Sequence, residues 1–255
     1  MKFVQIVFSP TGGTQRVADA ITESWSKDIE RIDLSDAAKD FSTVNIEKDD
    51  YVLIAVPSFG GRVPAVATQR LSKINGNKAK CAIVCVYGNR AYDDTLIELK
   101  NIAQKSGFTV LSAVSAVAEH SILHQYATGR PDNEDIKTLQ NFSAKILEKF
   151  KNSNTDEKSI TVPGNSNYKK AGAGGVVPKA GKECVDCKMC AEKCPVGAID
   201  INNPKTTDSK KCISCMRCVS ICPNNARKVN GAMVAIAGLA IKKACSVKKE
   251  CELYI

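Results

Sequence analysis

The feature that most constrains this chain is a cysteine pattern that occurs twice in its last third. Each copy reads C-x-x-C-x-x-C-x-x-x-C-P. The cysteines are Cys184, Cys187, Cys190 and Cys194 in the first copy and Cys212, Cys215, Cys218 and Cys222 in the second. A zinc site usually separates its two C-x-x-C pairs by a longer stretch, and disulfides need an oxidising compartment to which nothing here points. The pattern therefore favours a pair of metal clusters.

This double pattern resembles the two-cluster ferredoxins of bacteria, over roughly residues 181–229. In those proteins three cysteines of each run hold one 4Fe-4S cube, and the fourth reaches the other cube. The resemblance implies two crossed ligand sets. They are Cys184, Cys187, Cys190 and Cys222 for one cluster, and Cys212, Cys215, Cys218 and Cys194 for the other.

The first 150 residues alternate between strand and helix patterns. Strands are expected at residues 3–8, 29–34, 51–56, 79–87 and 108–118, and helices at 14–27, 66–74, 94–105 and 132–151. The strands are nearly continuous apolar runs, as in a parallel sheet covered on both faces. This alternation predicts an α/β fold, a doubly wound parallel sheet of five strands in the order 2-1-3-4-5.

The composition divides the chain into four parts. Residues 1–150 form the α/β domain, and residues 151–180, rich in Asn, Ser, Lys, Gly and Pro, predict a linker that is flexible in part. Residues 181–230 form a small α+β ferredoxin-like domain. Residues 231–255 are expected to be a helical tail that packs onto one of the domains.

A loop rich in hydroxyls and glycine follows the first strand and leads into a helix, which is a favourable anion site. It lacks the lysine of a Walker A loop and the G-x-G-x-x-G of dinucleotide loops. The loop resembles the FMN-phosphate loop of flavodoxins, although an ordinary capped loop is the alternative. The resemblance implies phosphate contacts from Ser9, Thr11, Gly12, Gly13 and Thr14.

Two further loops end the third and fourth strands, at the sheet edge where ligands bind in doubly wound folds. The resemblance to flavodoxins implies that they line the flavin ring. Their residues are Pro57, Ser58, Phe59, Gly60, Gly61 and Arg62, and Tyr87, Gly88, Asn89, Arg90, Tyr92 and Asp93. One departure from the family matters: the single tryptophan, Trp25, lies on the first helix, which leaves Phe59 and Tyr92 for stacking. For Arg62 and Arg90 two roles are open: each either stabilises reduced flavin or is a solvated surface residue.

The remaining cysteines and histidines give weaker signals. Cys81 and Cys85 lie in an apolar strand and are expected to be core thiols. Cys245 and Cys251 lie outside both cysteine runs and are expected not to be ligands. His120 follows the fifth strand, where it either contacts flavin or substrate or is an ordinary loop residue.

The charge of the chain indicates its partners. The net charge of the 255 residues is +9, and because residues 1–150 are balanced, the whole excess lies in residues 151–255. The lysines are scattered and no nucleic-acid motif is present, so an acidic redox partner is favoured over nucleic acid. The longest apolar run, residues 232–241, is half a membrane span, and no secretion signal is evident. We expect a cytoplasmic protein without membrane partners.

The combination of the two domains resembles the clostridial-type flavodoxin–ferredoxin fusion proteins of anaerobes. That resemblance implies an electron-transfer protein with FMN and two 4Fe-4S clusters, which passes single electrons to and from redox partners. The alternatives are an FMN-dependent reductase of a nitro compound or quinone, fed through the clusters, and a redox sensor. The sequence leaves open the electron donor and acceptor and the oligomeric state.

Overall fold

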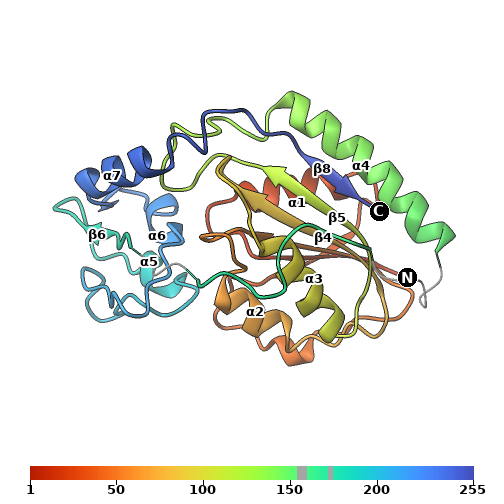
Figure 1. Ribbon diagram of the computed structural model, residues 1–255. Coiled ribbons are helices and arrows are strands. Elements are labelled where there is room, and N and C mark those ends of the chain that lie inside the picture. Colours follow the sequence, from red (N-terminus) through yellow and green to blue (C-terminus); the bar gives the residue numbers. More distant parts are fainter. Residues whose placement is uncertain (154–159, 172–174) are drawn as a thin grey trace.

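The first domain is a doubly wound α/β fold built on one sheet (Figure 1). The computed structural model describes residues 1–153, 160–171 and 175–255. The sheet order is β2-β1-β3-β4-β5-β8, and all neighbours are parallel except β5 and β8. The strands are β1 (Phe3–Val7), β2 (Ile29–Asp33), β3 (Tyr51–Pro57), β4 (Lys80–Tyr87), β5 (Thr109–Val117) and β8 (Glu252–Tyr254). The predicted order 2-1-3-4-5 is confirmed, and β8 adds a sixth strand that was not predicted.

Helices cover both faces of the sheet, which explains why its strands are apolar on both sides. They are α1 (Gly13–Thr22), η1 (Phe41–Thr43), α2 (Ala65–Leu71), α3 (Thr95–Lys105) and α4 (Asn133–Asn152). Along β3, Ile54 packs into the core under α2 and α3, whereas Leu53 packs into the core under α1 and α4. Trp25 belongs to this second core and donates its indole N–H to Ser143 Oγ at 2.9 Å.

The cysteine module, residues 181–230, adds little apolar core of its own. It contains α5 (Met189–Glu192), α6 (Arg217–Ser220) and β7 (Arg227–Lys228), which pairs in antiparallel fashion with β6 (Lys179–Ala180). Its buried hydrophobic cluster, within the described residues, consists of Cys190, Ala191 and Ile199. Domains of this size usually need a metal or another staple to fold, and the eight cysteines are suited to that role.

The segment between the domains, where it is described, runs beside α3. Asp94 accepts the backbone N–H groups of Asn165 and Lys169 at 2.9 and 2.7 Å, and Lys100 Nζ donates to Ile160 O at 2.9 Å. The predicted linker began at residue 151, but α4 continues to Asn152. Residues 154–159 and 172–174 of the predicted linker lie outside the described residues. Residues 160–169 are therefore attached to the first domain, whereas β6 at the end of the linker pairs with the module.

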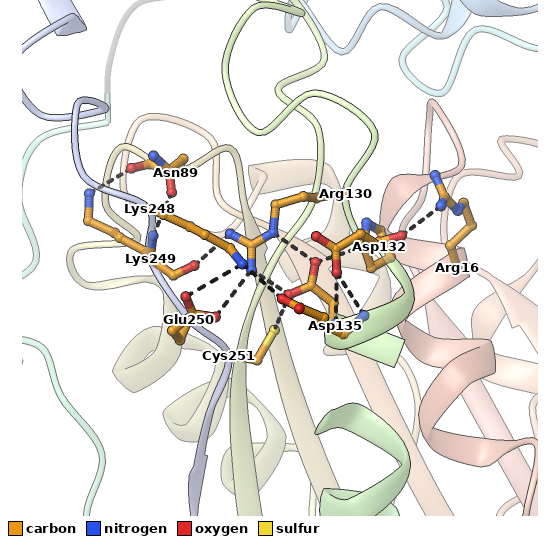
Figure 2. A network of polar contacts seen from close by, with 11 residues as sticks. Arg16, Asn89, Arg130, Asp132, Asp135, Lys248, Lys249, Glu250 and Cys251 are labelled. Atoms are coloured by element: carbon orange, nitrogen blue, oxygen red, sulfur yellow. Dashed lines mark hydrogen bonds and ion pairs between the residues drawn. The ribbon is translucent and has the colours of Figure 1, made fainter. Parts of the chain in front are cut away.

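After the module the chain returns to the sheet and ends in β8 (Figure 1). Asn89 Nδ2 donates to the carbonyls of Cys245 and Val247, both at 3.0 Å, and Asn89 Oδ1 accepts from Lys249 N at 3.0 Å. Arg130 lies at the centre of this network and donates to Lys249 O at 2.5 Å while it pairs with Asp135 (Figure 2). We call residues 242–254 the strap, because they connect the module to β5.

The expectation of a helical tail packed onto a domain is corrected in two respects. The helix, α7 (Gly231–Ile241), covers less than half of the tail, which ends as a strand. Gly238 is its buried residue and accepts the hydroxyl of Tyr126 at 2.8 Å, whereas Ile236 and Leu239 are 69% and 72% exposed. The hydropathy of the sequence predicted an apolar helix, but it did not predict how few of the helix residues are covered by the rest of the protein. Among the described residues, no helix has both the length and the apolar character to cross a membrane.

Candidate redox sites

The two cysteine runs form two separate hollows, each with sulfur from both runs. The outer hollow, of about 370 Å³, is lined by Cys184, Cys187, Cys190 and Cys222. The inner hollow, of about 350 Å³, is lined by Cys194, Cys212, Cys215 and Cys218. The structure thus brings together the crossed sets that the sequence predicted, and it separates each fourth cysteine from its neighbours in sequence.

Both runs have the same backbone conformation around their second cysteine. The residues on either side of the second cysteine have positive φ: Asp186 (53°) and Lys188 (63°) in the first run, Ser214 (54°) and Met216 (61°) in the second. These left-handed residues turn the chain around each hollow before α5 and α6 begin. The fourth cysteines of the two runs also accept equivalent hydrogen bonds. Cys194 Sγ accepts the N–H of Ala198 at 3.3 Å, and Cys222 Sγ accepts that of Ala226 at 3.2 Å.

The donors in these hollows fit iron–sulfur clusters. Each hollow offers four thiols, the ligand set of a 4Fe-4S cube. A single zinc ion would need its ligands gathered at about 2.3 Å around one point. Among the described residues, no three His, Cys, Asp or Glu side chains converge in that way. The four cysteines of each set instead line one hollow, as the ligands of a cube would.

Electrostatics at the inner hollow couples cluster assembly to proton release. Burial raises the pKa of Cys215 to about 11 and that of Cys218 to about 12. Arg217 near Cys215 and Arg227 near Cys218 oppose this rise. Because ligands must be thiolates, cluster binding has to displace these protons, and the two guanidinium groups favour the charged form.

A third hollow, of about 1070 Å³, lies at the carboxyl ends of the central strands, and we call it the flavin hollow. Three of the predicted loops meet there, as the topology requires. The predicted residues in its wall are Thr11, Gly13, Thr14, Pro57, Ser58, Phe59, Gly60, Tyr87 and Gly88. The position of this hollow and the loops that line it are those expected for a ligand site in a doubly wound fold.

The phosphate end of this hollow is the start of α1. Gly12 precedes the helix with φ of 90°, a conformation that favours glycine, and has no side chain that could cap the helix. The N–H groups of Gly13 and Thr14 can therefore face an anion, with buried Thr14 in the same wall. Ser9 and Gly12 do not line the hollow, and Ser9 Oγ accepts the N–H of Gln15 at 2.9 Å.

Several residues predicted to line the ring lie outside the wall. They are Gly61, Arg62, Asn89, Arg90, Tyr92 and Asp93. Arg62 donates to both carboxylate oxygens of Glu98 at 2.7 Å, a contact that raises the pKa of Arg62, and it also donates to Lys169 O. Tyr92 OH lies 3.0 Å from Tyr254 OH in the strap. Both side chains are held by partners distant in sequence, so neither is available to the flavin hollow.

The amino-acid sequence of the module also matches a known family. Residues 183–227 match the family model described as a 4Fe-4S dicluster domain. The predicted two-cluster module is confirmed. No curated protein gave a match to the chain.

Solved flavodoxins match the first domain at low identity. An archaeal flavodoxin is 18% identical with a TM-score of 0.44, over 59% of this chain and 99% of that one. Oxidised flavodoxin 1 from Bacillus cereus is 20% identical with a TM-score of 0.42, over 58% and 98%. Fusobacterium nucleatum flavodoxin bound to flavin mononucleotide is 15% identical with a TM-score of 0.41, over 59% and 99%. The flavodoxin-like fold of the first domain rests on its own strand order.

The flavin hollow also includes His120, for which the sequence left open a contact with flavin or substrate, together with neighbours that were not predicted. The loop after β5 contributes Glu119, His120, Ser121 and Ile122. His120 Nδ1 accepts the N–H groups of Ile122 and Leu123, both at 3.2 Å, and burial lowers the pKa of the ring. His120 therefore favours the neutral form, with its proton on Nε2. Its ring lies so close to Gly88 that a Cβ there would be 2.6 Å from that of His120.

The dicluster domain contributes the last part of the wall, through Ile213, Ser214 and Cys215. Cys215 lines both the inner hollow and the flavin hollow. Position at the end of β5 had pointed to His120, and the same signal applies to its neighbours Glu119, Ser121 and Ile122, because the fifth strand ends at the same edge of the sheet. No pattern in the sequence shows how the two domains are placed relative to each other.

Proposed function

We propose that this protein is an electron carrier that passes single electrons between two 4Fe-4S clusters and FMN on behalf of redox partner proteins. The observation that carries the proposal is the position of Cys215, which lines both the inner hollow and the flavin hollow. One side chain thus separates a predicted cluster site from a predicted flavin site. When bound, the cubes supply one-electron chemistry and the flavin one- or two-electron chemistry.

The outer hollow supplies the contact with a partner. Cys187 is exposed, and the apolar side chains of Val185 and Met189 at the same hollow are 66% and 41% exposed. Lys188 also lines it and, within the described residues, forms no ion pair. An exposed apolar rim with a free cation suits a redox protein with an acidic face. The thiols require a reducing compartment, and we place the protein in the cytoplasm.

The proposal is tested by removing one cluster at a time from anaerobically reconstituted protein. Under the crossed scheme, Cys194→Ala converts the inner cluster to a three-iron form or loses it, and Cys222→Ala does the same to the outer cluster. A small chemical reductant is mixed rapidly with each variant, and cluster reoxidation and flavin reduction are followed together. We expect the fast phase that links the two signals to disappear in Cys194→Ala and to persist in Cys222→Ala.

Iron analysis and EPR of the reduced variants check which cluster each substitution damages, and FMN content checks the flavin site. Both variants are expected to retain FMN, because neither cysteine lines the flavin hollow. A fast phase that survives in Cys194→Ala but is lost in Cys222→Ala contradicts the route through Cys215. Protein that binds no FMN contradicts the proposed function as a whole.

A further inference from the structure

The loop of the dicluster domain that lines the flavin hollow contains an unsatisfied hydroxyl. Ser214 has a buried Oγ atom that, among the described residues, has no hydrogen-bond partner. Buried polar atoms are almost always paired, so each exception needs an explanation. Ser214 also lines the flavin hollow, next to Cys215. A polar group of a ligand in that hollow would satisfy the hydroxyl.

The residue before Ser214 provides an apolar contact in the same wall. Ile213 packs against the core that lies under α2 and α3 of the first domain, and it also lines the flavin hollow. The only tryptophan of the chain is held in the opposite core, and Tyr92 faces the strap. The wall therefore has, in Ile213, an apolar side chain from the dicluster domain in addition to Phe59 and Tyr87 of the first domain.

Two arginines hold the dicluster domain against the first domain near this loop. Arg217, three residues after Ser214, donates from Nη1 to Ser35 Oγ at 2.7 Å, and its Nη2 lies 3.8 Å from Asp33 Oδ2. From the first domain, Arg70 donates to Pro195 O, beside Cys194, and to Leu34 O, both at 2.7 Å. The arginines are partly buried, which strengthens such charged hydrogen bonds. The dicluster domain is thus held beside the flavin hollow, and Ser214 is close in sequence to one of these contacts.

We propose that the dicluster domain forms part of the flavin-binding site, with the Ser214 hydroxyl as a hydrogen-bonding group for the flavin and Ile213 as an apolar cover. This inference rests on the proposed FMN site. It makes flavin binding depend on the second domain, so that the residue next to a cluster ligand also contacts the flavin. The site is then complete only when the two domains are docked.

The test uses the full-length protein with its clusters in place, and the probe is FMN itself. Ser214→Gly removes the hydroxyl and suits the positive φ of this position, and Ser214→Ala removes it with a Cβ retained. Ser220→Ala is the matched control, because that hydroxyl is exposed and bonds to Arg217 O in the same domain. Titration of flavin fluorescence gives the Kd, and iron and sulfide contents show that the clusters are intact.

We expect both Ser214 variants to bind FMN about 3- to 10-fold more weakly than the wild type, and the control to bind as the wild type does. Ile213→Ala, an independent variant, is expected to weaken FMN through the loss of apolar cover. If Ser214→Gly and Ile213→Ala bind FMN as tightly as the wild type, the dicluster domain is not part of the site, although the proposed function stands. If the wild type binds no FMN, both proposals fail.

Discussion

At the scale of single residues, the phosphate end of the flavin hollow depends on one buried hydroxyl. Thr14 is 4% exposed, lies in the first turn of α1, and lines the hollow at a helix end whose N-cap residue is glycine. A hydroxyl that donates to a charged group contributes about 1.5–3 kcal/mol. We expect Thr14→Ala to raise the Kd for FMN roughly 10- to 150-fold while the iron content is unchanged.

Riboflavin, which lacks the phosphate, provides the control for this variant. The wild type is expected to prefer FMN over riboflavin, and Thr14→Ala to lose much of that preference. Thr14→Ser keeps the hydroxyl and should bind FMN nearly as the wild type does. Equal FMN affinity in Thr14→Ala and the wild type, measured by fluorescence titration, contradicts the assignment of this loop to phosphate.

Residue roles were predictable where one local pattern determines them, and unpredictable where a distant partner does. The crossed grouping of the eight cysteines came from the resemblance of the repeated run to two-cluster ferredoxins. Arg62 and Asn89 lie in the predicted loops, but Glu98 and the strap turn their side chains away. Conversely, Ser214 enters the flavin hollow only because the domains dock. Such partners are set by tertiary contacts, which leave no trace in the spacing of residues.

At the scale of elements, the strap is attached through a buried ion pair. The side chains of Arg130 and Asp135 are 6% and 3% exposed, and Arg130 also binds Lys249 O (Figure 2). Breaking a buried pair by removing one charge costs about 3–5 kcal/mol. We expect Asp135→Asn to lower the free energy of unfolding by an amount near that range, and to expose the strap to cleavage by a lysine-specific protease. The control is Glu250→Gln, because Glu250 is 68% exposed and should matter little.

The pH dependence of this effect has a definite sign. Burial raises the pKa of Asp135, but the hydrogen bonds and charge of Arg130 outweigh it, so the pKa lies below the ordinary 3.8. A lowered carboxyl pKa gives stability that is present above the unfolded pKa and lost as pH falls through the folded one. The difference in melting temperature between the wild type and Asp135→Asn should thus be constant from about pH 8 to 5. A difference that disappears within this range contradicts the role of the ion pair.

The central elements were predictable because hydropathy with a period of two or 3.6 marks them over many residues. The strand β8 was missed because it spans three residues, Glu252–Tyr254, too few for any period to be visible. Its pairing with β5 depends on the strap bringing it to an open sheet edge. The small covered part of α7 was not predicted for a related reason: an apolar run predicts a helix but does not identify which residues pack against it.

At the scale of the whole molecule, the dicluster domain is connected to the first domain by covalent and noncovalent contacts on several sides. The described linker residues lie beside α3, and the strap pairs with β5. Arg217 and Arg70 each donate a hydrogen bond across the boundary between the domains. In Figure 1 the dicluster domain lies at one end of the molecule, away from the N-terminus. The inner hollow adjoins the flavin hollow through Cys215, and Cys187 of the outer hollow is exposed. This order of sites suits transfer between proteins more than isolated chemistry at one domain.

The last prediction separates a carrier from a reductase of small molecules. A basic half that docks on an acidic partner is screened over about 10 Å at 0.1 M salt and about 3 Å at 1 M. We expect electron exchange with a reduced acidic ferredoxin to slow steeply as salt rises, and Lys188→Gln to reproduce part of that loss at low salt. Lys137→Gln is the control, because Lys137 is an exposed residue on α4, away from the dicluster domain (Figure 1). Turnover of nitro compounds and quinones should be slow throughout. Rapid, saturable and salt-independent reduction of one such compound, in stopped-flow measurements under anaerobic conditions, would favour the reductase, because a small neutral acceptor meets the flavin without the charged docking step.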